Sequence, residues 1–194
     1  MNFDLWFPTA ILSDNVENYQ EINEKLLKKI SEIRNSHPSG GPNWLGKPYN
    51  TCGTYNIVQD PDFAEIIKEI TLRVKHYATR LGINLSRYQP SCEEGWLNIY
   101  NQNDFQEYHY HAGFQFSAVY YVSTSENSSE IIFESPNPPN MNPLPIILHG
   151  PLTDERIRYT AEAGKVIIFK SNLKHCVPPQ QGTGERISLA FNFK

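Results

Sequence analysis

Apolar residues recur at intervals of three and four along residues 16 to 35. The recurring positions are Val16, Tyr19, Ile22, Leu26, Ile30 and Ile33. Because a helix completes a turn about every 3.6 residues, this spacing gathers them on one face and predicts an amphipathic helix. Asp14, with Glu17 three residues later, is typical of a helix N-terminus, and the pattern ends at Asn35, before Pro38.

A second helical pattern runs from residue 60 to residue 82. It opens with an acidic capping residue and a proline at the first helical position, Asp60 and Pro61. Its apolar face consists of Phe63, Ile66, Ile67, Ile70, Val74, Tyr77 and Leu81. Gly82 is a natural end, because glycine adopts the left-handed conformation that terminates many helices. Between the two helices, HPSGGPNWLGKP at residues 37 to 48 is rich in turn-forming residues and predicts a loop.

From Pro90 onward the pattern changes to short runs of β-branched and aromatic residues. These runs are CEEGWLNIY (92–100), FQFSAVYYV (114–122), EIIFE (130–134), PIIL (145–148), RIRYT (156–160), KVIIF (165–169) and RISLAFNF (186–193). Gly, Pro, Asn and Ser separate them, and SPNPPNMNPLP at residues 135 to 145 predicts a long loop. We therefore expect an α+β fold in a single domain over residues 1–194. A helical support region (1–90) would precede an antiparallel β-sandwich or barrel (91–194) of about seven or eight strands.

Composition and charge argue against several classes of function. The 194 residues are 39% hydrophobic and 12% aromatic, which is typical of a globular chain. A net charge of -4 and the lack of a basic stripe argue against a nucleic-acid partner. No apolar run approaches the length of a membrane span, and the N-terminus has no basic region like that of a signal peptide. The three cysteines are scattered and form no recognisable motif, so we expect a cytoplasmic protein.

Two of the six histidines stand two residues apart, in YHYHAG at residues 108 to 113. Residues i and i+2 of a strand point to the same face, so His109 and His111 would share a face if this segment is extended. A metal needs at least one more protein ligand, and His175, in LKHCVPP, follows the strand-like run KVIIF. A closed β-structure would bring His175 beside His109. The pattern therefore indicates a candidate metal site made of these three histidines.

The last strand-like run alternates between an apolar and a polar face. The apolar positions are Ile187, Leu189 and Phe191, and the opposite positions are Arg186, Ser188, Ala190 and Asn192. If the apolar face packs on the helices, the polar face lines a cavity. An arginine inside a cavity selects a planar anion, usually a carboxylate. Ser188 shares the face of Arg186 and can bond the same anion. In FQFSAVYYV, Ser117, Val119 and Tyr121 share one face, so Tyr121 can reach this anion as well.

Four segments, in this order, resemble the iron(II) and 2-oxoglutarate-dependent dioxygenases, above all the prolyl-hydroxylase-like branch with its bacterial and phage relatives. They are WLNIY with His109 nine residues later, SAVYYV, GKVIIFKSNLKH and RISLAFN, covering residues 94 to 193. The resemblance implies a double-stranded β-helix, or jelly roll, with supporting N-terminal helices. It also implies Fe(II) and the cosubstrate 2-oxoglutarate, with ascorbate as an optional reductant. The implied reaction hydroxylates a C–H bond and releases succinate and CO2.

The same resemblance implies roles for individual residues. His109 and His175 match the two iron-binding histidines. The residues implied to bind the cosubstrate are Arg186, Tyr121, Ser188 and Tyr100, with Arg186 on the distal carboxylate of 2-oxoglutarate. The residues expected to shape the substrate pocket are Trp96, Asn98 and Tyr108. The loops at 40–56 and 135–145 are its expected rim.

The chain departs from the family at the acidic metal ligand. The usual set is two histidines and one carboxylate, whereas His111 occupies the position of the acid. Three alternatives follow. His111 is itself the third ligand, or Glu107 supplies a carboxylate from the other side of His109, or His111 points elsewhere and a water or halide completes the site. The choice matters because a neutral imidazole does not offset the charge of the ion as a carboxylate does.

The prolyl-hydroxylase likeness favours a peptide or protein substrate, with a peptidyl proline as the reacting residue. The same chemistry on a small metabolite is the main alternative. Two further classes stay open: a non-catalytic jelly-roll binding module with a vestigial metal site, and a three-histidine dioxygenase that uses no 2-oxoglutarate. Arg186 distinguishes the last class, which has no need of an anion-binding arginine. The oligomeric state is left open.

Overall fold

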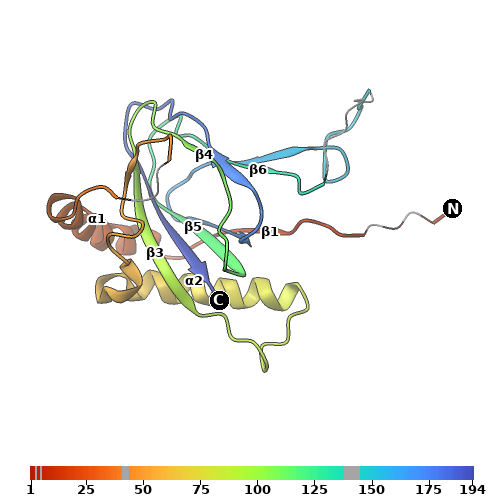
Figure 1. The fold of residues 1–194 in the computed structure, drawn as a ribbon, viewed down its shortest axis with the longest axis horizontal. Helices are drawn as coiled ribbons and strands as arrows, with labels where there is room; N and C mark the ends of the chain where they lie inside the picture. The colour runs from red at the N-terminus through yellow and green to blue at the C-terminus, as the bar shows by residue number, and fades with distance from the viewer. Residues whose placement is uncertain (3, 5, 41–43, 138–144) are drawn as a thin grey trace.

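The computed structural model describes residues 1–2, 4, 6–40, 44–137 and 145–194. Within these residues, two antiparallel sheets face each other and helices cover one of them (Figure 1). This arrangement confirms the expected α+β class and the double-stranded β-helix with supporting helices. The predicted loop at 135 to 145 lies mostly outside the described residues, as do residues 41 to 43 of the loop predicted between the helices.

The supporting layer contains two α-helices, α1 (Tyr19–Ser36) and α2 (Ala64–Arg80), with the short 3-10 turns η1 (Ile57–Gln59) and η2 (Pro61–Phe63) before α2. The predicted start of the first helix is wrong. Asp14 lies in a strand, because residues 11 to 15 pair with the sheet, and Asn18 occupies the cap position of α1. The capping residue predicted for the second helix, Asp60, instead caps η2: its side chain accepts the backbone N–H of Asp62. The α-helix α2 follows at Ala64, without a side-chain cap of its own. Gly82, at φ 80°, follows its end.

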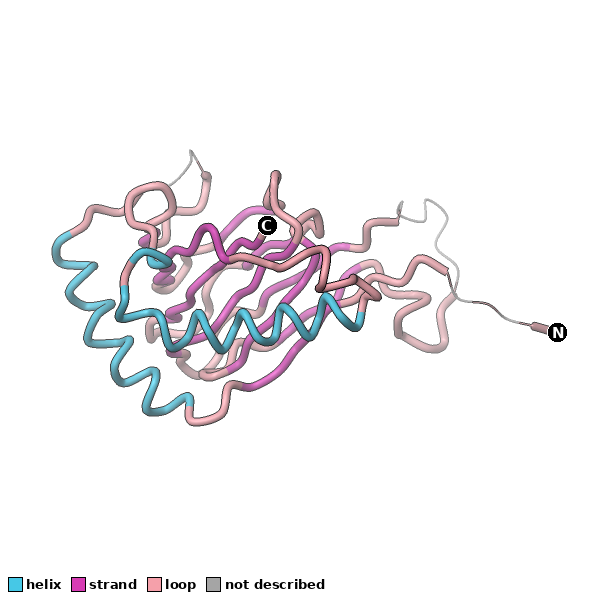
Figure 2. Tube along the Cα trace, turned by 90° about the horizontal axis from the view of Figure 1, so that it is seen from below, coloured by secondary structure: helices cyan, strands magenta, loops and turns pink. Residues whose placement is uncertain are grey.

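The larger sheet has the strand order β1-β8-β5-β10-β3-β2. Its strands are β1 (Ile11–Asn15), β8 (Lys165–Lys170), β5 (Phe116–Ser123), β10 (Arg186–Phe193), β3 (Cys92–Tyr100) and β2 (Tyr49–Asn50). Both α-helices lie against the same face of this sheet (Figure 2). Their apolar residues join those of the strands in one core, which removes the apolar face of the sheet from water. Neither helix described here combines the length and apolar character needed to cross a membrane.

Alternation along β10 gives the larger sheet two different faces. The residues in the helix-facing core are Ile187, Leu189 and Phe191, as predicted. The alternate residues, Arg186, Ser188 and Ala190, line a cavity on the opposite face. Antiparallel register with β3 and β5 sets rows across this face: Ser188 stands opposite Asn98 and Tyr121. The position of β10 therefore determines which polar side chains meet between the two sheets.

The smaller sheet has the order β4-β9-β6-β7, with β4 (Gln106–His109), β9 (His175–Val177), β6 (Ile131–Glu134) and β7 (Arg156–Tyr159). A second apolar cluster lies between the sheets and consists of Tyr121, Ile131, Phe133, Ile167, Phe169 and Leu173. The strand predicted at residues 145 to 148 is wrong. That run pairs with none of the described strands and leaves Ile147 and Leu148 exposed. Its apolar residues therefore do not belong to a strand of either sheet.

Candidate metal and anion-binding site

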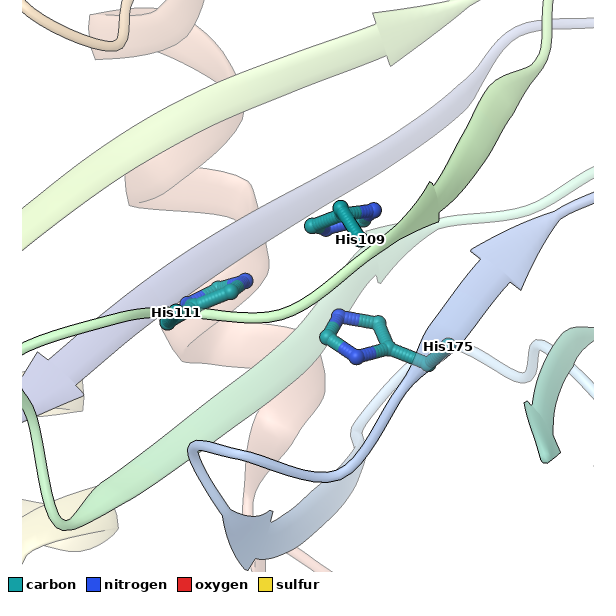
Figure 3. A group of neighbouring side chains, drawn as sticks. All are labelled: His109, His111 and His175. Carbon is teal, nitrogen blue, oxygen red and sulfur yellow. The ribbon is translucent and has the colours of Figure 1, made fainter. Parts of the chain in front are cut away.

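Three histidines meet between the two sheets (Figure 3). Antiparallel pairing of β4 with β9 places His109 directly opposite His175. His111 follows the end of β4, and its backbone N–H donates to the carbonyl oxygen of Ser171 at 2.8 Å. The ring centroids lie 4.3 to 5.3 Å apart. One nitrogen of each ring lies within 4.8 Å of the corresponding nitrogens of the other two.

Hydrogen bonds at Nδ1 orient all three imidazoles. His109 and His175 each have Nδ1 2.8 Å from the backbone carbonyl oxygen two residues earlier. Nδ1 of His111 lies 2.5 Å from the side-chain oxygen of Asn192. An acceptor at this position holds the ring proton on Nδ1 and leaves the lone pair on Nε2. This is the tautomer in which an imidazole binds a metal through Nε2.

Burial keeps the three rings neutral. It lowers the pKa of His111 to about 4 and also lowers the pKa of His109 from its ordinary value. The pKa of His175 lies well below the ordinary value, because burial and then the two neighbouring imidazoles oppose a positive charge. Only a neutral imidazole has a lone pair to donate, so burial prepares these rings to act as metal ligands at neutral pH.

This donor set fits a divalent transition metal. Imidazole nitrogens suit iron, zinc, copper and nickel. Three nitrogens bound to one ion at about 2.1 Å lie roughly 3 to 3.6 Å apart, so at a spacing of up to 4.8 Å the rings would have to move closer together to bind one ion. The cluster contains no Asp, Glu or Cys among the residues that the structure describes. This favours the alternative in which His111 is the third ligand.

A cavity of about 430 Å³, its open mouth included, extends from the histidines to the polar face of β10. The residues predicted from the sequence that line it are His109, His111, His175, Arg186, Ser188, Tyr100, Trp96 and Asn98. The expectation for Tyr108 requires correction. Because neighbouring strand residues face opposite ways and His109 points inward, the Tyr108 ring lies outside, beneath Lys174 and Arg156.

A buried arginine occupies the part of this cavity formed by β10. Arg186 is 1% exposed, and its Nε donates to the carbonyl oxygen of Ser129 at 3.0 Å. Its other nitrogens reach the hydroxyls of Ser188 and Tyr121 at 3.4 and 3.5 Å. The ion pairs found within the described ranges do not include Arg186. A guanidinium stays charged even when buried, so this pocket favours an anionic ligand.

Two tyrosine rings flank the guanidinium of Arg186. Their centroids lie 4.7 Å away for Tyr100 and 4.9 Å away for Tyr121. Burial raises the pKa of Tyr100 to about 12 and also raises the pKa of Tyr121, although the charge of Arg186 opposes both changes. Both phenols therefore keep their protons at neutral pH and can donate hydrogen bonds to an anion.

Glu107, the alternative carboxylate ligand, binds a loop instead. Its carboxylate accepts the backbone N–H groups of Leu45 and Gly46 at 2.7 and 3.3 Å. Burial alone would raise the pKa of Glu107, but backbone N–H bonds outweigh it and lower the pKa. At Gly46 a Cβ atom would lie 1.9 Å from the carbonyl oxygen of Phe105, so only glycine permits this close approach. These contacts anchor the segment that carries Trp44.

Trp44 is a candidate functional residue that the sequence analysis did not single out, although its loop was expected at the rim. Its indole lies 5.8 Å from the His109 ring, between centroids, and it lines the cavity. Trp96 lies 5.5 Å from the His111 ring in the same way. A tryptophan inside the turn-rich stretch GGPNWLGKP is the signal that could have identified it, because functional side chains are frequent in such loops.

Residues 94–192 of the chain match the family model described as "Putative 2OG-Fe(II) oxygenase". This segment is just over half of the chain and contains the three histidines and Arg186. A comparison with curated proteins found no match.

Solved structures share the fold at low sequence identity. A Pseudomonas putida prolyl-4-hydroxylase matches over 96% of this chain and 93% of its own, with 14% identity and a TM-score of 0.66. A Trichoplax adhaerens prolyl hydroxylase, in complex with a hypoxia inducible factor oxygen degradation domain peptide fragment, matches over 95% and 83%, with 14% identity and a TM-score of 0.64. HygX from Streptomyces hygroscopicus, with nickel, 2-oxoglutarate and hygromycin B bound, matches over 96% and 83%, with 14% identity and a TM-score of 0.62.

Replacing Glu107 with alanine is expected to free the segment that carries Trp44. Two backbone N–H groups lose a charged acceptor, so the amides of residues 45 and 46 should exchange with solvent roughly tenfold faster or more. Hydrogen-exchange mass spectrometry of a peptide that spans these residues measures the change. Glu185→Ala, which removes a surface partner of Arg34, is the control and should leave this peptide unaffected. Unaltered exchange in Glu107→Ala would mean that other contacts anchor the segment.

The lowered pKa of His111 predicts a stability that depends on pH. Between the ordinary value of 6.5 and about 4, the unfolded chain binds a proton at this residue that the folded protein does not bind. The stability that His111 contributes to the folded protein is therefore complete above pH 6.5 and is lost as the pH falls from there toward about 4. The free energy of unfolding should decrease through this window by up to about 1.4 kcal/mol per pH unit from this residue.

Urea unfolding of the metal-free protein at about pH 7 and about pH 5 measures this dependence. His111→Gln removes the titrating ring and should lose less stability between the two conditions than the wild type. His76→Gln, on the exposed side of α2, removes a histidine outside the cluster and should lose as much as the wild type. Equal losses in His111→Gln and the wild type would contradict the role of burial.

Proposed function

The chain belongs to the 2OG-Fe(II) oxygenase family, and we propose that it hydroxylates a C–H bond in an iron(II)- and 2-oxoglutarate-dependent reaction. One oxygen atom of O2 enters the substrate as a hydroxyl group and the other enters succinate, while 2-oxoglutarate loses CO2. The main support is a single cavity that contains three neutral imidazoles together with a buried arginine.

His109, His111 and His175 would hold the iron through their Nε2 atoms. Bound there, Fe(II) supplies the activation of O2 with which the C–H bond is oxidised. The chain itself orients the rings, keeps them neutral and excludes water. Phe133 and Phe169 contribute to the last task, since their rings pack against His175 with centroids 5.7 and 4.7 Å away.

Arg186 would bind the distal carboxylate of 2-oxoglutarate. A planar carboxylate matches the fork of a guanidinium and forms two parallel charge-assisted hydrogen bonds with it. The hydroxyls of Ser188 and Tyr121 stand beside the guanidinium and can donate to the same anion. Their present contacts with it are long, at 3.4 and 3.5 Å. Shorter bonds to an anion would therefore replace weak ones.

The part of the cavity beside the histidines favours a compact apolar group as the site of reaction. The indoles of Trp44 and Trp96 flank the His109 and His111 rings. Flat aromatic surfaces of this kind suit an aliphatic ring, so we propose a peptidyl proline as the substrate. A small metabolite is the alternative. Among the structural neighbours, the Trichoplax adhaerens enzyme is in complex with a peptide and HygX has hygromycin B bound.

Gln106 offers one polar contact to such a substrate. Its amide nitrogen donates to Glu107 at 3.0 Å, which turns the amide oxygen away from that carboxylate. This oxygen is buried and has no hydrogen-bond partner within the described part of the chain, and the residue lines the cavity. An N–H or O–H group on the bound substrate would satisfy it.

We also propose that the whole chain forms one domain and acts in a reducing compartment such as the cytoplasm. The helices share an apolar core with the strands of residues 91–194, which supports a single domain. All three cysteines have free thiols, which suits a reducing environment. With a net charge of -4, we expect neither nucleic acid nor a membrane as a partner.

An anaerobic titration of the metal-free protein with Fe(II), and then with 2-oxoglutarate, tests this function. The wild type should bind both and develop the visible charge-transfer band of the iron–2-oxoglutarate complex. Arg186→Leu should keep its Fe(II) affinity but lose about 30-fold or more in 2-oxoglutarate affinity, because losing one partner of a buried charged contact costs about 2 kcal/mol or more. Tyr121→Phe keeps the ring and removes one donor, so its loss should be smaller.

Each failure of this titration has a distinct meaning. Iron binding without 2-oxoglutarate binding would replace the cosubstrate proposal with a three-histidine site of another kind. If no iron binds, a non-catalytic binding module becomes the better description. If both bind, succinate release from a panel of proline-containing peptides and small metabolites decides the substrate class. Turnover with metabolites alone would overturn the peptide proposal.

A further inference from the structure

The third histidine is oriented differently from the other two. His109 and His175 donate their Nδ1 protons to backbone carbonyls of their own segments, so the main chain determines their orientation. His111 donates instead to the side chain of Asn192 on β10, at 2.5 Å. A substitution at position 192 can therefore change one ligand and leave the other two as they are.

Asn192 belongs to a row of polar side chains across three strands. The sheet register places it directly opposite Glu94 on β3 and Ser117 on β5. Its amide nitrogen donates to Glu94 at 3.2 Å, and its oxygen accepts from Ser117 at 2.9 Å. The Ser117 hydroxyl also lies 2.9 Å from that of Ser171 and 3.1 Å from Nδ1 of His111. The middle of the row is buried, with Asn192 3% exposed and Ser117 0%.

The carboxylate at one end of this row determines where the proton lies at the other end. An ionised Glu94 can only accept, so Asn192 turns its NH2 group toward Glu94 and its oxygen toward His111. That oxygen can also only accept, so Nδ1 of His111 carries the proton. The lone pair of His111 is then on Nε2, on the side of the other two histidines.

We propose that Asn192 is a positioning residue that makes His111 able to bind the metal, an inference that rests on the proposed metal-binding function of the three histidines. A carboxylate at position 111, as in the usual ligand set, can bind through either oxygen and has no tautomers. A neutral imidazole has only one lone pair, so it binds only when its proton is on the other nitrogen. The exchange of an acid for histidine thus creates a requirement, and Asn192 meets it.

Three variants separate this role from a general contribution to folding. Asn192→Leu removes the acceptor and fills the space, so that water cannot replace it. Asn192→Asp keeps an acceptor toward His111, and Glu94→Gln accompanies it in both measurements, because two carboxylates at positions 94 and 192 would repel each other. Asn23→Leu is the matched control, because Asn23 is a similarly buried asparagine that bonds Val122 and Tyr120, two residues of the core beneath the helices. If Asn192→Leu does not fold, Asn192→Ala takes its place in both measurements.

The first measurement determines the tautomer of His111 in the metal-free protein. Long-range nitrogen–proton NMR spectra of protein labelled with 15N-histidine distinguish a protonated Nδ1 from a protonated Nε2, and His111→Gln assigns the signals. The wild type, Asn192→Asp and Asn23→Leu should have the proton of His111 on Nδ1. Asn192→Leu should move it wholly or partly to Nε2.

The second measurement is calorimetric titration with Co(II) alone, a stable substitute for Fe(II). Loss of an outer hydrogen-bond partner of a metal-binding histidine typically weakens affinity by about 10- to 100-fold, and we expect this loss in Asn192→Leu. Asn192→Asp and Asn23→Leu should stay within about threefold of the wild type, well below that range.

The two measurements distinguish the failure of this inference from the failure of the proposed function. A wild-type tautomer and wild-type Co(II) affinity in Asn192→Leu would overturn the positioning role. If Asn23→Leu weakened Co(II) binding as much as Asn192→Leu does, the effect of Asn192 would be a general contribution to folding and not a positioning role. If the wild type binds no Co(II), the proposed metal function fails. The tautomer result alone then decides whether Asn192 orients His111.

Discussion

The antiparallel pairing of β10 with β3 and β5 is the constraint on which the site depends. Arg186 and Asn192 lie on the same face of this strand, six residues and roughly 20 Å apart along it. One strand therefore sets both the anion-binding end of the site and the support of the histidine end. A shift of the β10 register by one residue would point Arg186 toward the apolar core and Leu189 toward the cavity. The burial of the apolar face under the helices thus protects the geometry of the polar face.

Burial leaves the two kinds of nitrogen group in the cavity with different charges. It lowers the pKa of each histidine, so the three imidazoles are neutral and each keeps a lone pair that a metal ion could accept. The guanidinium of Arg186 cannot respond in this way and keeps its charge. Within a few strands the same apolar surroundings therefore create a neutral donor cluster and a cationic pocket. An organic acid that chelates a metal at one end and carries a second carboxylate at the other matches both.

The parts of this fold that could be predicted from the sequence are those that local periodicity encodes. The alternation of β10 follows from a two-residue repeat, and the end of α2 just before Gly82 follows from the backbone freedom of glycine. Features that depend on a distant partner could not be predicted. Asp14 resembles a helix cap but lies in a strand, because residues 11 to 15 pair with β8. The orientation of Tyr108 likewise depends on which strand face meets the cavity.

The same limit applies to the acidic residues around the histidines. From the sequence, Glu107 is an alternative ligand because it stands two residues from His109, whereas Glu94 has no visible connection to the site. In the folded chain Glu107 anchors the Trp44 loop, and Glu94 is linked to His111 through Asn192. Both carboxylates therefore act by orienting other groups. Because neither carboxylate touches the three imidazoles, these would bring no negative charge to a bound metal ion, and an anionic ligand would offset the charge of the ion instead.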